Sequence, residues 1–176
     1  EFLPLYLDPE HFARSLKILR QVCVKITGDR SRYKDENEAI VEVIAKLMNT
    51  QVVLLCDKGL SASAKALTGY CQLHRLLLAI VGRSAVVRKS VRSKITAFVT
   101  DALQRTKEHT KSLGVILPLL SVSDSYGWKH LGMPYFFEAV DRSILWACAK
   151  DESLAVVKPG DKTRLKRHFD VTKVSR

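Results

Sequence analysis

The sequence predicts an all-α fold, an irregular multi-helix bundle of antiparallel helical hairpins with seven to eight helices. Apolar residues recur at helical spacing along most of the chain, and Gly, Pro and capping residues punctuate these stretches at short intervals. Helices joined by short connections usually pack as antiparallel neighbours. These two patterns leave little of the chain for strands.

The first helix is expected to begin at Asp8-Pro9-Glu10 and to end at Gly28. The Asp8 side chain can cap the helix, Pro9 suits its first turn, and Glu10 favours the positive end of the helix dipole. Apolar residues then follow at intervals of three and four, and residues 29–34 form a polar loop.

A second helix is expected from Asp35 or Asn37, with Asn49-Thr50 interrupting it. The run Val52 to Cys56 could be a strand or a helical turn, because periodicity cannot distinguish short buried runs. The absence of any other strand-like run favours a helix there.

The third helix is expected to be the central one. It follows a turn at residues 57–59, has Ser61 or Ser63 as its cap, and reaches about Val81 before Gly82. Leucines and other apolar residues cover most of its circumference, which is typical of a helix surrounded by others.

Residues 85–105 read as one helix with an apolar inner stripe and a basic outer arc. Ser112 is the expected cap of a further apolar element at 113–120. Pro118 must kink or end that element, because proline lacks the backbone N–H and clashes with the preceding turn.

The loop 121–128 precedes a helix expected to run from Pro134 to about Lys150, and Pro159-Gly160 separates it from a last, basic helix capped by Asp161. Helical spacing divides the larger side chains of the longer helix between two faces. One face holds Met133, Phe137, Val140, Ile144 and Cys148, and the other holds Tyr135, Ala139, Arg142 and Trp146. The last helix has a thin apolar seam of Leu165, Phe169 and Val174.

At 176 residues we expect residues 1–176 to form a single helical domain, excised from a longer protein, with the basic terminal helix at 158–176 able to fold semi-independently. Its style is HEAT- or armadillo-like by fold-level analogy only, since we find no convincing repeat. The four cysteines form no CxxC pair, and we expect reduced, buried thiols in an intracellular protein, cytoplasmic or nuclear. The longest apolar runs predict no membrane span.

Two segments carry all of the surplus charge. Residues 83–111 hold eight Lys and Arg against two acids, a net of +6, and residues 158–176 hold seven against two, a net of +5. Their sum equals the formal net charge of the whole chain, +11. Charge confined in this way selects anionic partners. The candidate partner-binding residues are Arg88, Lys89, Arg92, Lys94, Lys162, Arg164, Lys166 and Arg167, and we expect the two segments to adjoin in one basic face.

A second candidate site is the loop containing Asp124, Tyr126 and Trp128, where large aromatic side chains stand beside small polar ones as they do in interaction anchors. The alternative is structural, with Trp128 folded onto the core and Asp124 capping a turn.

The common catalytic signatures are absent from the sequence, including GxGxxG, GxxxxGK, HExxH and GxSxG. Cys71 and His74 share a helix face, but a buried thiol beside a hydrogen-bonded imidazole explains them as well. The least implausible acid–base cluster is Glu138, Asp141 and His130. We therefore expect no enzyme, no cofactor and no metal.

Three functions remain open at this stage. The leading hypothesis is a non-catalytic interaction or scaffold domain that binds an acidic protein segment or another anionic partner. The alternative is a domain that binds structured RNA or duplex nucleic acid through phosphate contacts, because the basic segments contain no Trp or Tyr on which bases could stack. An enzyme of unrecognised type is less favoured, and self-association is compatible with the thin seam of the last helix.

Overall fold

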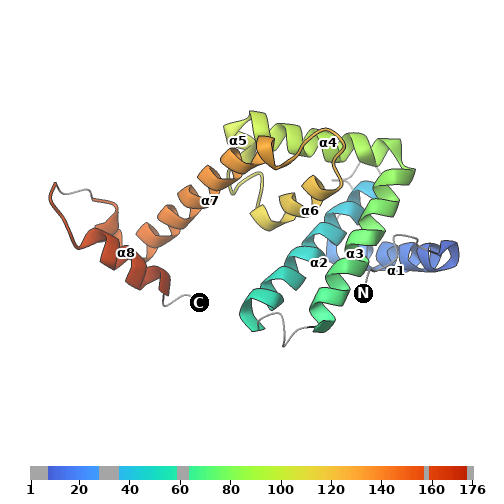
Figure 1. The fold of residues 1–176 in the computed structure, drawn as a ribbon, viewed down its shortest axis with the longest axis horizontal. Coiled ribbons are helices and arrows are strands. Elements are labelled where there is room, and N and C mark those ends of the chain that lie inside the picture. Colours follow the sequence, from blue (N-terminus) through green and yellow to red (C-terminus); the bar gives the residue numbers. More distant parts are fainter. Residues whose placement is uncertain (1–7, 28–35, 59–63, 157–158, 174–176) are drawn as a thin grey trace.

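The computed structural model of the chain describes residues 8–27, 36–58, 64–156 and 159–173 (Figure 1). Within these ranges it contains eight α-helices, two short 3₁₀ helices and no strand. The all-α class is therefore confirmed. The HEAT- or armadillo-like style is not confirmed.

Helices α1 (Pro9–Thr27), α2 (Glu36–Lys58) and α3 (Ala64–Arg83) form the first half of the molecule. The predicted start of α1 is confirmed, because the Asp8 carboxylate accepts hydrogen bonds from the backbone N–H groups of Glu10 at 2.9 Å and His11 at 3.1 Å. The predicted caps of α3, Ser61 and Ser63, lie outside the described residues.

Helix α2 runs without a break through Asn49-Thr50, so the expected interruption there is wrong. Thr50 donates its hydroxyl proton to the carbonyl of Lys46 at 3.1 Å, and the Asn49 amide points to Ser112 at 3.4 Å. Both polar side chains are thus accommodated beside an intact helix. The run 52–56 is helical, as favoured.

The helix predicted over 85–105 is two helices, α4 (Ala85–Thr100) and α5 (Ala102–Arg105). Asp101 separates them in an extended conformation and accepts the backbone N–H of Leu103 at 2.8 Å, so it acts as the cap of α5. The Arg105 guanidinium then donates to the carbonyls of Phe98 and Val99 near the end of α4. The signal that we missed is an aspartate at a possible cap position.

The apolar element at 113–120 consists of η2 (Leu113–Val115) and α6 (Ile116–Ser121). Ser112 precedes it without a side-chain cap hydrogen bond. Pro118 lies in the first turn of α6, where its missing N–H would have no helical partner. It therefore neither kinks nor ends the helix.

Helix α7 (Trp128–Lys150) begins six residues before the predicted start, so Pro134 lies inside it. The first turn is stabilised by His130, whose Nδ1 accepts the backbone N–H of Gly127 at 3.1 Å. η3 (Glu152–Leu154) and α8 (Arg164–Lys173) follow. Asp161 accepts the N–H of Thr163 at 2.9 Å, and Gly160 takes a left-handed φ of 78°, which favours glycine.

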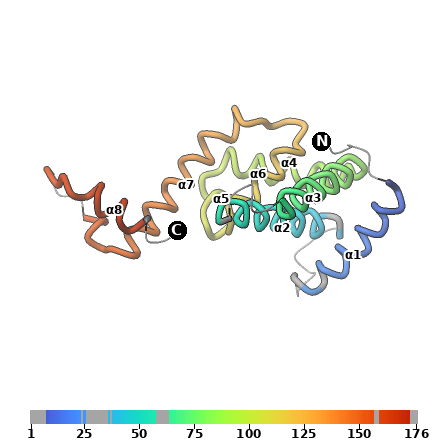
Figure 2. The backbone as a smooth tube through the Cα atoms, turned by 60° about the horizontal axis from the view of Figure 1, so that its bottom comes forward, coloured from blue at the N-terminus to red at the C-terminus, as the bar shows by residue number. Residues whose placement is uncertain are grey.

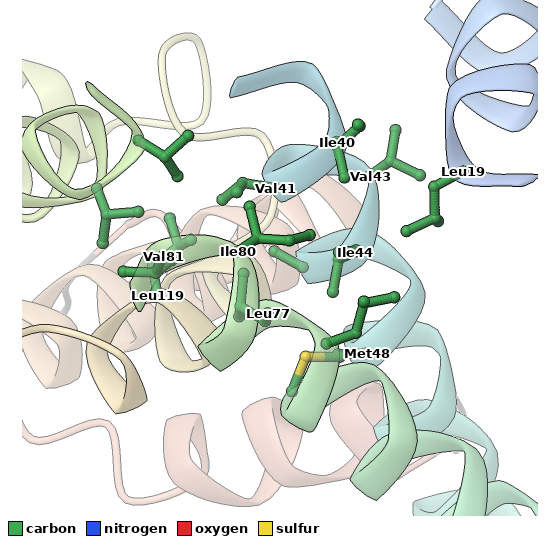
Figure 3. Packing of buried hydrophobic residues seen from close by; sticks show 14 of the residues in the cluster. Leu19, Ile40, Val41, Val43, Ile44, Met48, Leu77, Ile80, Val81 and Leu119 are labelled. Carbon is green, nitrogen blue, oxygen red and sulfur yellow. The ribbon is translucent and has the colours of Figure 1, made fainter. Parts of the chain in front are cut away.

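The main core surrounds the first half of α2. Figure 3 shows labelled side chains from α1, α2, α3 and α6 gathering around this helix. Ile40, Ile44 and Met48 on α2 and Leu77 on α3 are fully buried. A smaller cluster of Phe98, Ile116 and Leu131 joins α4, α6 and the beginning of α7.

The molecule is elongated. In both views α7 leads away from the body formed by α2, α3, α4 and α6, and α8 lies at its far end, while α1 lies at the opposite end (Figures 1 and 2). The chain from α7 onward is therefore an arm attached to the body mainly through the first half of α7.

The cysteines are all free, but only Cys23 is buried. Cys71 and Cys148 are half-buried, and Cys56 is exposed, so the expectation of buried thiols is wrong for Cys56. By length and composition alone, Glu38–Asp57 in α2 could cross a membrane, a test that core helices also pass. In this fold the first half of that segment forms the core.

Candidate functional site

The basic arc of α4 is mostly engaged with its own surroundings. Both carboxylate oxygens of Asp124 accept hydrogen bonds from Arg92 Nη2 at 2.9 Å. Arg88 Nη2 donates to the carbonyl of Gly82 at 2.8 Å, at the end of α3. Of the four residues predicted on this arc, only Lys89 makes no hydrogen bond or ion pair with its side chain to another described residue.

Lys94, the fourth, faces two acids on α2. Its Nζ lies 3.8 Å from Glu38 Oε1 and 3.7 Å from Glu42 Oε2. These carboxylates are more than 50 residues away in sequence, so local charge counting could not reveal them. Three of the four cations therefore have structural partners.

The four candidate residues near the C-terminus also include some that have partners within the fold and some that are exposed. Arg164 donates twice to the carbonyl of Leu154, at 3.2 and 2.8 Å, and Arg167 pairs with Asp161. Lys162 and Lys166 are exposed. Two of these four candidates thus stabilise the turn between η3 and α8, and two remain on the surface.

The two basic segments do not adjoin. Helix α4 lies in the body, whereas α8 lies at the end of the α7 arm, and both views separate them (Figures 1 and 2). The expected single basic face is wrong. Charge counting along the sequence could not predict this, because the distance depends on the length and direction of α7.

The three residues of the candidate loop, Asp124, Tyr126 and Trp128, lie in different environments. Hydrogen bonds, first from the Ser125 hydroxyl and then from Arg92, hold the pKa of Asp124 below its ordinary value. The Tyr126 hydroxyl accepts from Thr96 at 2.9 Å, and its ring packs against the core. Both side chains thus have partners within the fold, whereas Trp128 is 60% exposed at the start of α7.

His74 of the Cys71–His74 pair has a hydrogen-bond partner outside the pair. His74 Nε2 lies 2.9 Å from the Ser121 hydroxyl, which donates its only proton to the carbonyl of Pro118 at 2.7 Å. The imidazole must therefore donate to Ser121 rather than accept its proton. Burial lowers the pKa of His74, which agrees with a neutral ring.

The acid–base candidate at Glu138 is an ion pair. Glu138 accepts from Arg142 Nε at 2.7 Å, and both side chains are largely buried. Arg142 Nη2 also donates to the carbonyls of Arg105 at 2.6 Å and Thr110 at 2.7 Å. This arginine fixes α7 to the segment that follows α5, so the cluster has a structural role.

The outer face of α7 is the most distinctive surface of the molecule. Five large apolar side chains share one side of this helix and are between 36 and 61% exposed: Met133, Phe136, Phe137, Val140 and Ile144. Their spacing of three and four residues places them in one stripe. The opposite side, with Leu131, Glu138 and Arg142, faces the body. We call the five residues the α7 stripe.

Exposure of such a stripe is unusual for a folded domain. Single exposed apolar residues are ordinary, but a contiguous patch usually marks a surface for association. The stripe continues toward Ala147, which is fully buried, and the second half of the arm packs η3 and α8 against α7.

Cations flank the stripe. Lys129 is exposed beside it in the first turn, and Lys150 lies over the Trp146 ring, 6.0 Å from the centroid. Lys162 and Lys166 are exposed on the neighbouring α8 segment. Against these stand the exposed acids Asp141, Glu152 and Asp170. The exposed lysines therefore outnumber the exposed acids of the same segments by four to three.

Sequence spacing found this face but not its exposure. It grouped four of the five residues together, yet an amphipathic pattern does not say which of two apolar faces meets the body. The neighbouring pair Phe136-Phe137 broadens the stripe and is the one local signal that we passed over.

No family model, curated protein or solved structure matches the chain. Function must therefore be inferred from the surface itself.

Proposed function

We propose that this chain is a non-catalytic helical interaction domain that binds an acidic protein segment through the α7 stripe. The observation that carries the proposal is the exposure of five large apolar side chains in one stripe on the outer face of α7. The proposal keeps the expected class of function and moves the binding surface from α4 to α7.

The apolar stripe would supply most of the affinity. Complete burial of one large apolar side chain contributes about 1.5–3 kcal/mol, and a dissociation constant of 1 μM corresponds to about 8 kcal/mol. Association and side-chain ordering offset part of this gain. Because the stripe side chains are already partly covered, we expect dissociation constants of roughly 10–100 μM for a single helical segment.

The flanking cations would select the partner. A segment whose apolar face is bordered by Asp and Glu can meet Lys129, Lys150 and the exposed lysines of α8. Opposite charges steer encounter and exclude wrong partners. A second copy of the chain carries the same +11 charge and is repelled, which disfavours self-association.

An amphipathic helix fits this surface better than an extended segment. The stripe follows one side of α7, and helices pack by placing the side-chain ridges of one into the grooves of the other. Recognition would then use apolar anchors at intervals of three, four and seven residues.

The nucleic-acid alternative has less support. Arg92 and Lys94 face carboxylates. Of the exposed Trp and Phe residues, four lie on α7, one (Phe169) lies on α8, and none lies on the basic arc of α4. A titration with random RNA and duplex DNA is the matching control. Binding that is removed by charge reversal on α4 and unaffected by changes in the α7 stripe would favour nucleic acid.

Fluorescence anisotropy of a labelled peptide provides the test, because helical spacing places both tryptophans of the chain, Trp128 and Trp146, on the side of α7 away from the stripe. The ligand is a synthetic helical peptide with leucines on one face and glutamates beside them. We expect a saturable rise in anisotropy that weakens with salt, and none with the peptide in which lysines replace the glutamates.

Phe136→Ser with Phe137→Ser should remove most of this response. The matched control is Val86→Ser, because Val86 is a similarly exposed apolar residue on α4. Equal affinity of the double variant and the control for the acidic peptide would exclude the α7 stripe as the binding surface.

A further inference from the structure

A cavity of about 590 Å³ lies on the body side of the molecule, away from the α7 stripe. Its walls are one side of α2, the second half of α4, residues 104–112 and the η2–α6 segment. Sites for small ligands usually have volumes of about 300–1,000 Å³. The volume of this cavity therefore lies in the range of small-ligand sites.

The floor of the cavity is apolar. Val41, Phe98, Ile116 and Leu119 are buried there, and Ala97 and Val115 are half-buried. These side chains come from α2, α4, η2 and α6, so the floor belongs to the folded body. It would receive a ring or a short hydrocarbon chain.

The polar wall contains an ammonium group without a hydrogen bond. Lys94 Nζ lies 3.7 and 3.8 Å from Glu42 and Glu38, distances too long for hydrogen bonds, and no hydrogen bond to another described residue uses it. Lys46 lies 2.8 Å from Glu42 and balances that carboxylate. Lys94 therefore keeps its ion pairs with both carboxylates and still has N–H donors that could turn toward a ligand.

The segment after α5 adds a second cation to the lining. Lys111 is exposed on the segment after α5 and lines the same cavity. The charged lining residues are three lysines (Lys46, Lys94 and Lys111) and two glutamates (Glu42 and Glu108), and Glu38 behind Lys94 brings the local sum to zero. Lys111 makes no ion pair with a described residue, so it is the cation that favours an anion over a cation.

This wall is held in place by α7. Arg142 donates to the carbonyls of Arg105, Thr110 and Lys111, the last at 3.4 Å. Thr110 also donates its hydroxyl proton to the carbonyl of Gln104 at 2.8 Å. The segment is therefore anchored at several backbone positions, as the wall of a binding site requires.

We propose that this cavity binds a small organic anion, with an apolar body on the Phe98 and Ile116 floor and a carboxylate or phosphate between Lys94 and Lys111. The proposal is independent of the α7 stripe, since it uses another surface and another class of ligand. Carboxylate and phosphate share the required chemistry, so both are tested.

The experiment is a ¹H–¹⁵N NMR titration of the whole chain with 2-naphthoate and, separately, with 2-naphthyl phosphate. Naphthalene-2-methanol supplies the same ring without charge. We expect saturable shifts at residues 93–98 and 108–116, dissociation constants of roughly 0.1–1 mM for at least one anion, and much weaker binding of the alcohol.

The variant Lys94→Met should weaken binding of the anion by about tenfold or more, because it removes the proposed charge-assisted hydrogen bonds. Lys89→Met is the matched control: it removes the same charge from the same helix outside the cavity, and it should change affinity less than about twofold. Ala97→Leu, which fills the floor, should abolish saturable shifts while the far-ultraviolet circular dichroism spectrum stays helical.

Four results would each overturn the proposal. These are an absence of saturable shifts with either anion, shifts centred on the outer face of α7, equal binding of the alcohol and the anions, and equal effects of Lys94→Met and Lys89→Met. A preference for the carboxylate or for the phosphate identifies the headgroup and supports the site.

Discussion

Helices α2 and α7 have the same length, 23 residues each, and both carry large apolar side chains, but they end in opposite environments. Met48 on α2 is fully buried, whereas Met133 on α7 is 61% exposed. The body closes around α2 because α1, α3, α4 and α6 contribute side chains to it. Helix α7 is anchored by Leu131 and Arg142 on its inner side, and its apolar stripe faces outward. An apolar stripe thus indicates that a helix will be covered, but not by what.

The largest difference between the two regions should appear in paired phenylalanine variants. Phe98, 1% exposed, joins α4 to α7, so Phe98→Ala should reduce the free energy of unfolding by about 3–5 kcal/mol. Phe136→Ala, at a 60% exposed position, should change it by less than about 0.5 kcal/mol. Urea unfolding followed by circular dichroism measures both. Similar losses would mean that the α7 stripe is packed within the monomer.

The attachment of the arm depends on Arg142. Arg142→Met removes hydrogen bonds to three backbone carbonyls and the ion pair with Glu138, so we expect the free energy of unfolding to fall by about 2–3 kcal/mol. Amide hydrogen exchange should rise at residues 105–112 and at the start of α7, while the first half of α2 stays protected. Unchanged exchange at 105–112 would show that the arm is held by other contacts.

Gly114 in η2 tests how closely this segment packs against Asn49 of α2 in the body. A methyl group on Gly114 would lie 2.6 Å from Asn49 Cγ and closer still to its Oδ1. Gly114→Ala should therefore lower stability by about 1–3 kcal/mol. Gly127→Ala is the control, since nothing lies near the position of its Cβ. Adding Asn49→Ala should restore part of the loss, and additive losses in a double-mutant cycle would refute the overlap.

The smallest expected effect is a pH dependence of the free energy of unfolding that arises from His74 in the body. Burial lowers the pKa of His74 in the folded state, so the unfolded chain binds more protons below the ordinary value of 6.5. The contribution to stability is therefore full above that pH and is lost as the pH falls below it. His74→Gln, which keeps a donor for Ser121, should reduce the slope of stability between pH 7 and 5. The exposed His109→Gln is the control, and equal slopes would contradict this role.

The sequence predicted most of the fold, because helix termini are governed by local chemistry. The Asp8 cap and the Asp161 cap stand where their neighbours required them. The errors came from residues with two possible roles. Asp101 could extend or end a helix, and Pro134 could start a helix or lie inside one. Asn49-Thr50 was read as a break, but distant Ser112 and nearby Lys46 provide partners for the two side chains.

The candidate site was less predictable, because ion pairing is nonlocal. Arg92 meets Asp124 across 32 residues, and Lys94 meets acids on α2, so the charge of α4 is compensated by segments that looked neutral. Exposure of the α7 stripe depends on Arg142 and Leu131 fixing the opposite side of the helix. Neither fact follows from spacing or composition. The sequence could predict the residues of a surface, but only the fold could show which surface is open.

Oxidation of methionine by hydrogen peroxide tests the central claim most directly, because the chain has two methionines and one stands in each region. Mass spectrometry should find Met133 oxidised at close to the rate of an unstructured peptide and Met48 oxidised far more slowly. The acidic helical peptide should slow oxidation of Met133 and leave Met48 unchanged. Equal protection of both residues in the free protein, or no protection of Met133 by saturating peptide, would contradict the account.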